Sequence, residues 1–125
     1  MTAARPLLLL TAITGALAVA FGAFGAHALR DTLGAAQLAT WQTAVSYLFW
    51  HVLAALFAAR YGETAQSRPA LLAAALFLAG SLVFSSTLFA VALGAPRWLG
   101  AITPLGGTAL IAGWLVLARA VWRRA

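Results

Sequence analysis

The sequence has no cysteine, no lysine and only two acidic residues, Asp31 and Glu63. The absence of cysteine excludes a disulfide framework, a thiolate zinc site and a cysteine nucleophile. Charged residues make up 8% of the chain, whereas a soluble domain usually carries about a quarter. The chain therefore lacks the charges that a water-exposed surface needs. Disorder is excluded as well, because it requires polar and highly charged sequence.

Apolar residues are abundant instead, at 64% of the 125 residues. They form four runs, each near the length of about 20 residues that a helix needs to cross a bilayer. The runs cover residues 7–29, 41–59, 70–94 and 105–122. Because lipid offers no partner to backbone amides, such runs predict helices. We therefore predict one all-α membrane domain over residues 1–125, an integral bundle of four transmembrane helices in the cell (inner) membrane.

The arginines predict how this bundle is oriented. With four spans, Arg30 and Arg97 lie on one side of the membrane, and the other six arginines share the opposite side with both termini. Those six are Arg5, Arg60, Arg68, Arg119, Arg123 and Arg124. Positive charge collects on the cytoplasmic side, so both termini are predicted to be cytoplasmic, with Trp41 and Trp98 at the outer interface.

The same arginines indicate which partners to expect. They stand between apolar runs or at their ends, rather than on a soluble basic face. This pattern is typical of charges that meet lipid headgroups. The lipid bilayer is therefore an expected partner, and nucleic acid is not.

His51 is the most informative residue inside the spans, because ionisable groups near the middle of a bilayer are costly. Matching depth across the hairpin of the second and third spans places Tyr47 and His51 level with Ser81 and Ser85. Each pair has the i, i+4 spacing that puts both residues on one helix face. We predict that these spans are neighbours, that His51 faces the interior, and that the four residues form a buried hydrogen-bond ladder. A neutral, structural histidine is favoured; a proton relay or a ligand site is the alternative.

A second polar cluster, formed by His27, Arg30 and Asp31, is predicted at the outer boundary of the first span. If that helix continues, His27 and Asp31 stand at i, i+4 and can pair; contact with water and headgroups is the ordinary interpretation. Asp31 and Glu63 are predicted on opposite sides of the membrane, so they cannot act together in acid–base catalysis. No enzymatic activity, metal site or cofactor is expected.

Small residues at helical spacing predict close helix packing, because apolar side chains do not drive helices together in lipid. They are Gly15, Ala18, Gly22, Gly25 and Ala26 in the first span and Gly106, Gly107 and Gly113 in the fourth. Packing within the bundle is the favoured use of these residues, and a dimer face is the alternative.

Several motifs cover nearly the whole chain in order. They are residues 22–29 (GAFGAHAL), residues 41–44 (WQTA) followed by Tyr47 and His51, Phe84-Ser85, residues 99–107 (LGAITPLGG) and Gly113-Trp114. Together they resemble the small four-helix membrane protein family of unknown function that includes YgdD-type bacterial inner-membrane proteins and animal transmembrane protein 256. One departure is Ser86 within residues 85–89 (SSTLF), where the family pattern has glycine. The resemblance implies a four-helix membrane architecture and brings no established reaction.

Two functional hypotheses from different classes follow. The favoured one is a non-enzymatic structural or accessory module that self-associates as a homo-oligomer or docks on a larger membrane complex. The alternative is a small-solute or proton pathway through the bundle, centred on His51. One histidine and several hydroxyls, without a carboxylate at that depth, provide few groups for exchanging protons.

Overall fold

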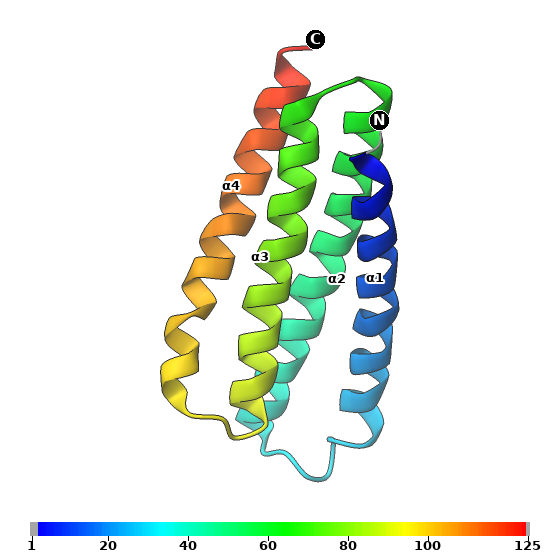
Figure 1. The fold of residues 1–125 in the computed structure, drawn as a ribbon. Coiled ribbons are helices and arrows are strands. Elements are labelled where there is room, and N and C mark those ends of the chain that lie inside the picture. The colour runs from blue at the N-terminus through cyan, green and yellow to red at the C-terminus, as the bar shows by residue number, and fades with distance from the viewer. Residues whose placement is uncertain (1–2, 125) are drawn as a thin grey trace.

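The computed structural model describes residues 3–124, which form four long helices and one short 3₁₀ helix (Figure 1). The elements are α1 (Ala4–His27), α2 (Ala35–Thr64), α3 (Arg68–Ala92), the 3₁₀ helix η1 (Arg97–Ala101) and α4 (Thr103–Trp122). All four α-helices are long and apolar enough to cross a membrane. They alternate in direction, so α1 begins and α4 ends at the same end of the bundle (Figure 1). We name this end the terminal end, and the opposite end, with residues 28–34 and 93–102, the loop end.

The helix bounds differ from the bounds of the apolar runs. α2 is longer than the run 41–59 at both ends, because hydropathy marks the lipid-facing part while the helix continues beyond it. At the terminal end, Gln66 adopts a left-handed conformation (φ 51°) that turns the chain. Ser67 then caps α3 by accepting a hydrogen bond from the backbone N–H of Ala70. At the loop end, Gly94 (φ 98°) follows α3.

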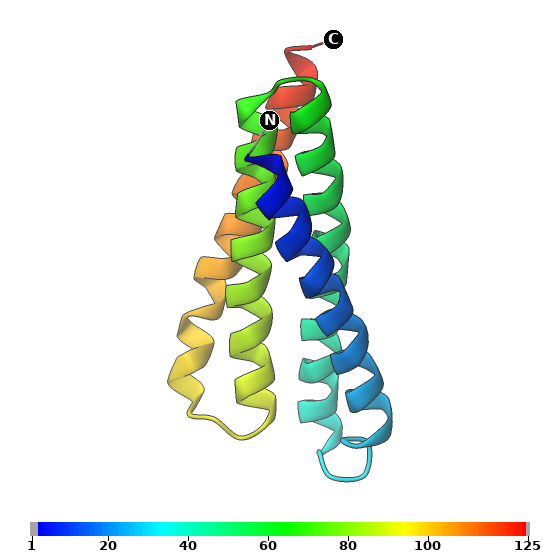
Figure 2. The ribbon, with the colours of Figure 1, turned by 45° about the vertical axis from the view of Figure 1, so that its right-hand side comes forward.

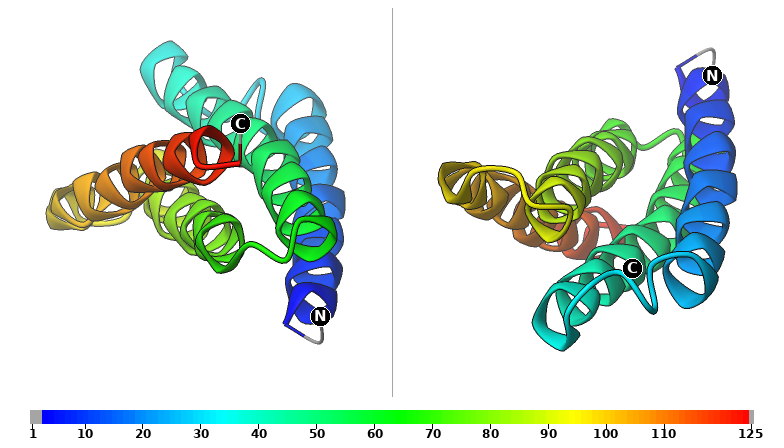
Figure 3. Two further views of the ribbon diagram at one scale, coloured as in Figure 1. Left: turned by 90° about the horizontal axis from the view of Figure 1, so that it is seen from above. Right: turned by 90° about the horizontal axis from the view of Figure 1, so that it is seen from below.

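Helices that follow one another in sequence pack against one another in space. α1 packs on α2, α2 on α3, and α3 on α4, which confirms the predicted contact between the second and third spans. Seen along the bundle, α1 and α4 lie on opposite sides of the α2–α3 pair (Figure 3). The hairpins α1–α2 and α3–α4 diverge toward the loop end (Figure 2). The arrangement leaves most of the surface of α1 and α4 facing outward.

The seam between α2 and α3 is built largely from alanine. One cluster of the core holds six alanines of the two helices that are at most 1% exposed, and Phe77 is the largest side chain that is fully buried. These alanines are Ala55, Ala58, Ala59, Ala70, Ala73 and Ala74. Short side chains allow two helix backbones to come close, which strengthens the van der Waals contacts between them. These contacts matter because the hydrophobic effect does not drive helices together in lipid.

Trp41 belongs to the core at the loop end. It is 3% exposed, and its indole nitrogen donates a hydrogen bond of 2.9 Å to the backbone carbonyl of Phe21 on α1. Its ring also packs against the ring of Phe89. The ring of Trp41 is therefore covered by neighbouring helices and is not free to contact headgroups, while its predicted depth at the outer interface stays a prediction. Trp98, at 66% exposure, remains free to do so.

The small residues of α1 face α2, with one exception. Ala18 and Gly25 are buried, and a Cβ added to Gly15 or Gly22 would touch a valine of α2. Ala26 is exposed and lies outside this seam. The positions that face α2 alternate between spacings of three and four residues, as helix packing requires; they are Gly15, Ala18, Gly22 and Gly25. Ala26 lies four residues after Gly22, where the alternation requires three, and therefore falls outside that face.

The small residues of α4 face α3. Gly106 is buried where the two backbones come closest, since a Cβ added there would lie 2.5 Å from the backbone nitrogen of Phe84 and 2.8 Å from the carbonyl oxygen of Gly80. Gly113 is buried against the ring of Phe77, and Gly107 is half-buried. Within this chain, Gly106 and Gly113 are therefore used for packing inside the bundle, while Gly107 stays partly open.

Candidate functional site

His51 lies inside the bundle with both nitrogens of its ring in hydrogen bonds. The side chain is 6% exposed, which confirms the prediction that it faces the interior. Its Nδ1 lies 2.7 Å from the backbone carbonyl oxygen of Tyr47, one turn earlier on α2. Its Nε2 lies 3.1 Å from the indole Nε1 of Trp114 on α4. His51 thus links two helices that pack mainly against α3 rather than against each other.

These two contacts select one protonation state for the ring. An indole N–H only donates and a carbonyl oxygen only accepts. Nε2 must therefore accept from Trp114, while Nδ1 carries the proton and donates it to the carbonyl of Tyr47. A doubly protonated ring would set its own Nε2–H against the indole N–H. The geometry supports a neutral His51 in a single tautomer.

Among the other members of the predicted cluster, His51 bonds only to the backbone of Tyr47, and the prediction that Tyr47 is buried is wrong, because its side chain is 36% exposed. The ring of Tyr47 stacks on the imidazole, with centroids 5.9 Å apart. Ser85 donates to the backbone carbonyl of Ala44 on α2 at 2.7 Å, and Ser81 donates to a carbonyl of its own helix at 3.1 Å. Between residues 3 and 124, no hydrogen bond joins His51 to either serine. In place of a ladder of side chains, each serine bonds to a backbone carbonyl.

A groove between α2 and α4 opens beside His51. Its volume is about 580 Å³, and it is lined by Tyr47, Trp50, His51, Phe84, Gly107, Leu110, Ile111 and Trp114. Trp50 and Trp114 stand at the exposed rim. His51 has no ring nitrogen left for a ligand, so the groove presents mainly aromatic and aliphatic side chains. Such a surface suits an apolar occupant held by packing rather than by hydrogen bonds.

The residues of the predicted outer cluster are exposed at the loop end. α1 ends at His27, where the N–H of Ala28 bonds to the carbonyl of Phe24, and the chain then turns. Asp31 is therefore not one helical turn beyond His27. In the described part of the chain the ion pair found is Arg60–Glu63, so the expected pairing of His27 with Asp31 does not form. His27, Arg30 and Asp31 are left in contact with the surroundings of the bundle.

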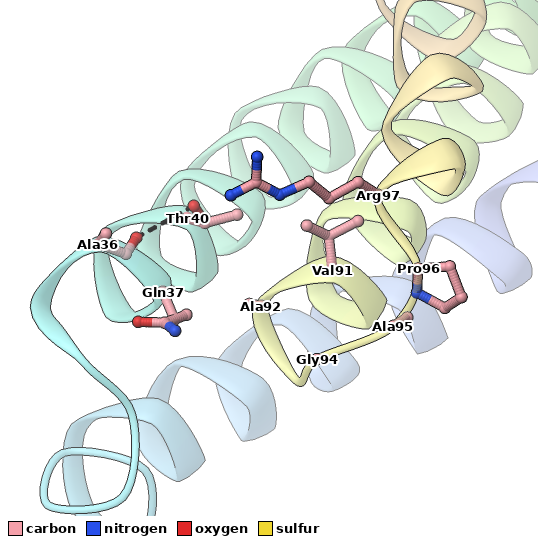
Figure 4. A pocket seen from close by; sticks show the side chains of 9 residues that line it. All are labelled: Ala36, Gln37, Thr40, Val91, Ala92, Gly94, Ala95, Pro96 and Arg97. Atoms are coloured by element: carbon pink, nitrogen blue, oxygen red, sulfur yellow. Dashed lines mark hydrogen bonds between the residues drawn. The ribbon is translucent and has the colours of Figure 1, made fainter.

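A hollow of about 500 Å³ lies at the loop end, where the two hairpins diverge (Figure 4). It is lined by residues 36, 37 and 40 at the start of α2 and by residues 91, 92 and 94–97. The side chain of Arg97 extends over the hollow toward α2 (Figure 4). The hydroxyl of Thr40 donates to the carbonyl of Ala36 at 3.1 Å. Sequence reasoning did not predict this hollow, because it depends on the angle between the hairpins.

No group of three or more His, Cys, Asp or Glu side chains suited to a metal ion occurs in residues 3–124. His27 and His51 lie at different depths of the bundle, the first at the loop end and the second inside. The arrangement around His51 offers packing and fixed hydrogen bonds, with neither a nucleophile–base pair nor a pair of carboxylates.

The chain is similar to a group of small membrane proteins over most of its length. The family described as "Protein of unknown function (DUF423)" matches residues 21–107. The UPF0382 membrane protein of Staphylococcus saprophyticus is 38% identical over 110 residues, which cover 88% of this chain and 91% of that protein. The UPF0382 inner membrane protein YgdD of Escherichia coli K12 is 35% identical over 113 residues, which cover 90% of this chain and 86% of YgdD.

No solved structure matches the chain. The matched region includes the whole of α2 and α3, with His51, and ends at Gly107 in α4. The extent of the family match and of the identity to these relatives is enough to assign the family. The chain therefore belongs to the DUF423 family of unknown function, together with the UPF0382 membrane proteins, and is a multi-pass protein of the cell (inner) membrane.

Proposed function

We propose that this protein is a non-enzymatic accessory module of the membrane, which self-associates or docks on a larger membrane assembly. The observation that carries this proposal is the closed interior. Within residues 3–124, every buried side-chain nitrogen or oxygen already has a hydrogen-bond partner. A buried side chain that already has a partner is not free to coordinate a solute. The buried hydroxyls bond mainly to backbone carbonyls, which do not pass a proton on, so the outward faces are left for function.

The groove between α2 and α4 is the outward face that best suits docking. Trp50 and Trp114 present large rigid rings at its rim, and Gly107 also lines it. Tryptophan and tyrosine bury much surface and lose little side-chain entropy on binding. In lipid, where packing drives association, such a groove can accept a helix of a second copy or of a larger assembly.

Site-specific photo-crosslinking in native membranes tests this proposal. Ile111 in the groove and Leu10 on the outward face of α1 are both apolar and exposed, so Leu10 serves as the control position. A photoreactive residue at 111 should give a protein adduct, at twice the 13.0 kDa of the chain for self-association or at a larger mass for another partner. Lipid adducts alone at both positions would contradict the proposal.

The alternative, a small-solute or proton pathway centred on His51, predicts a different outcome of substitution. Glutamine cannot titrate, so His51→Gln and His51→Leu should both abolish a pH-dependent cellular phenotype while leaving stability nearly intact. For an accessory module, His51→Gln should preserve both folding and activity. Lost function with normal stability in His51→Gln would favour the pathway over the module.

We also propose that both termini face the cytoplasm. Six of the eight arginines lie at the terminal end, while Arg30 and Arg97 lie at the loop end, and positive charge collects on the cytoplasmic side. Topology reporters fused after Gly34 and after the last residue should therefore respond oppositely, with the second one cytoplasmic. Equal responses, or the reverse assignment, would contradict this orientation.

A further inference from the structure

Three arginines line two adjoining hollows at the terminal end of α3 and α4. Arg68 stands in the first turn of α3, and Arg119 and Arg123 stand one turn apart at the end of α4. One hollow, of about 350 Å³, opens toward the α2–α3 loop. The other, of about 450 Å³, runs along the two helices toward Leu72 and Val116. All three arginines line both hollows.

These arginines have no carboxylate partner within residues 3–124. Glu63, the acid at this end, pairs with Arg60, and Asp31 lies at the loop end. Arg124 differs from the three, because its guanidinium donates to the backbone carbonyl of Gln66 at 3.3 Å. Like charges one helical turn apart destabilise each other, so Arg119 and Arg123 favour an anion between them. The planar guanidinium group matches phosphate oxygens in a two-pronged geometry.

The second hollow extends from these charges onto apolar surface. Leu72 on α3 is 53% exposed, and Val116 on α4 is half-buried beside it in the same hollow. Both residues belong to membrane-spanning helices, one to two turns inward from the arginines. A soluble anion would meet only the arginines, whereas a lipid would meet both surfaces at once.

We propose that this place is a binding site for an anionic phospholipid. The headgroup phosphate lies among Arg68, Arg119 and Arg123, and one acyl chain lies along Leu72 and Val116. Basic pockets between transmembrane helices are suited to anionic lipid headgroups. The proposal is independent of the docking role of the aromatic groove, which shares no lining residue with either hollow.

Native mass spectrometry of the full chain in detergent, titrated with phosphatidylglycerol, tests the proposal. Phosphatidylcholine with the same acyl chains is the uncharged comparison, and inorganic phosphate is the soluble anion. The test variant is Arg119→Gln/Arg123→Gln. Its matched control, Arg5→Gln/Arg30→Gln, removes the same charge from exposed arginines outside both hollows. Two further variants are Arg119→Lys/Arg123→Lys, which keeps the charge, and Leu72→Trp, which fills the apolar hollow.

We expect phosphatidylglycerol to bind the unchanged protein more tightly than phosphatidylcholine does. The glutamine pair should lose roughly 30-fold in affinity, since each arginine near an anionic surface contributes about fivefold. The control should stay within about twofold on the same scale. The lysine pair should retain most of the binding, and Leu72→Trp should weaken it with all charges in place.

Three results would overturn the proposal. The first is equal binding of both lipids to all variants. The second is that inorganic phosphate binds the unchanged protein as tightly as the lipid does, and that this phosphate binding is lost in the glutamine pair. Such a result would assign the site to a soluble anion. The third is that Leu72→Trp binds phosphatidylglycerol with undiminished affinity. Because this variant keeps all the charges, it tests the proposal even if the glutamine pair fails to fold.

Discussion

The seam between α3 and α4 and the seam between α1 and α2 both use glycine, but in different ways. In the α3–α4 seam, Gly106 meets the backbone of α3 itself. In the α1–α2 seam, Gly25 makes room for the side chain of Trp41. The first contact joins two helix backbones, whereas in the second an aromatic ring occupies the space beside a glycine. A backbone cannot move aside as a side chain can, so the α3–α4 seam tolerates less change.

The difference bears on the candidate site. α4 carries Trp114, the residue that donates to Nε2 of His51, and α4 is held in place mainly by α3. The α3–α4 seam therefore positions the indole N–H of Trp114 against Nε2 of His51. At the loop end the hydroxyls of Thr87 and Thr103, 2.7 Å apart, join the same two helices. α1 contributes no residue to the groove, so damage to the α1–α2 seam should leave the site intact.

The largest effect should come from Gly106→Ala. The added Cβ would lie within 3 Å of three backbone atoms of α3, and α3 and α4 would have to separate. We expect a loss of about 3 kcal/mol in the free energy of unfolding, the upper end for an overpacked core. Unfolding in a detergent–denaturant titration measures it. Gly107→Ala is the control, because its Cβ would make only ordinary contacts at 3.7 and 3.8 Å; equal losses in both variants would contradict a backbone contact.

A smaller effect is expected from Gly25→Ala. Its Cβ would lie 2.5 Å from the Trp41 ring, which the bond to the carbonyl of Phe21 holds in place. We expect a loss of about 2 kcal/mol, by the same titration. Gly22→Ala, whose Cβ would lie 3.4 Å from a valine side chain, should cost less than about 1 kcal/mol. A loss in Gly25→Ala that exceeds the loss in Gly106→Ala would reverse the order of the two seams.

The smallest effects concern His51. Hydrogen bonds between membrane helices average about 0.6 kcal/mol, so His51→Leu should lower stability by an amount of this order. His51→Gln keeps a group that can accept from Trp114 and should lose less. The unfolding titration compares both variants with Trp114→Phe, which removes the donor alone. A loss of several kcal/mol in His51→Gln would show that the imidazole does more than accept this bond.

More of the fold than of the candidate site could be predicted from the sequence. Four runs of near-membrane length predict four helices, and depth along a hairpin is a matter of counting residues. Counting residues also places Trp114 at the depth of His51, since each residue stands eight residues before the terminal end of its apolar run. What counting does not provide is the rotation of α4 about its axis, which decides whether residue 114 faces α2.

The partners of the serines were less accessible to sequence reasoning. Ser85 bonds to the carbonyl of Ala44, and any residue type could supply that carbonyl. Trp41 shows a related limit: its type and position predict an interface residue, but Gly25 on another helix allows it to be buried. The residue type shows that a side chain needs a hydrogen-bond partner or a packing neighbour. The way the helices cross determines which group provides it.

The protonation state of His51 tests the closed interior most directly. Nitrogen-15 spectra of the ring-labelled protein in lipid bilayers at neutral pH distinguish the two neutral tautomers from the doubly protonated ring. The variant His27→Gln removes the second histidine and isolates the His51 signals. We predict a neutral ring protonated at Nδ1, with the Nε2 signal shifting in Trp114→Phe. A doubly protonated ring, or a ring protonated at Nε2, would contradict the hydrogen bonds that close the interior.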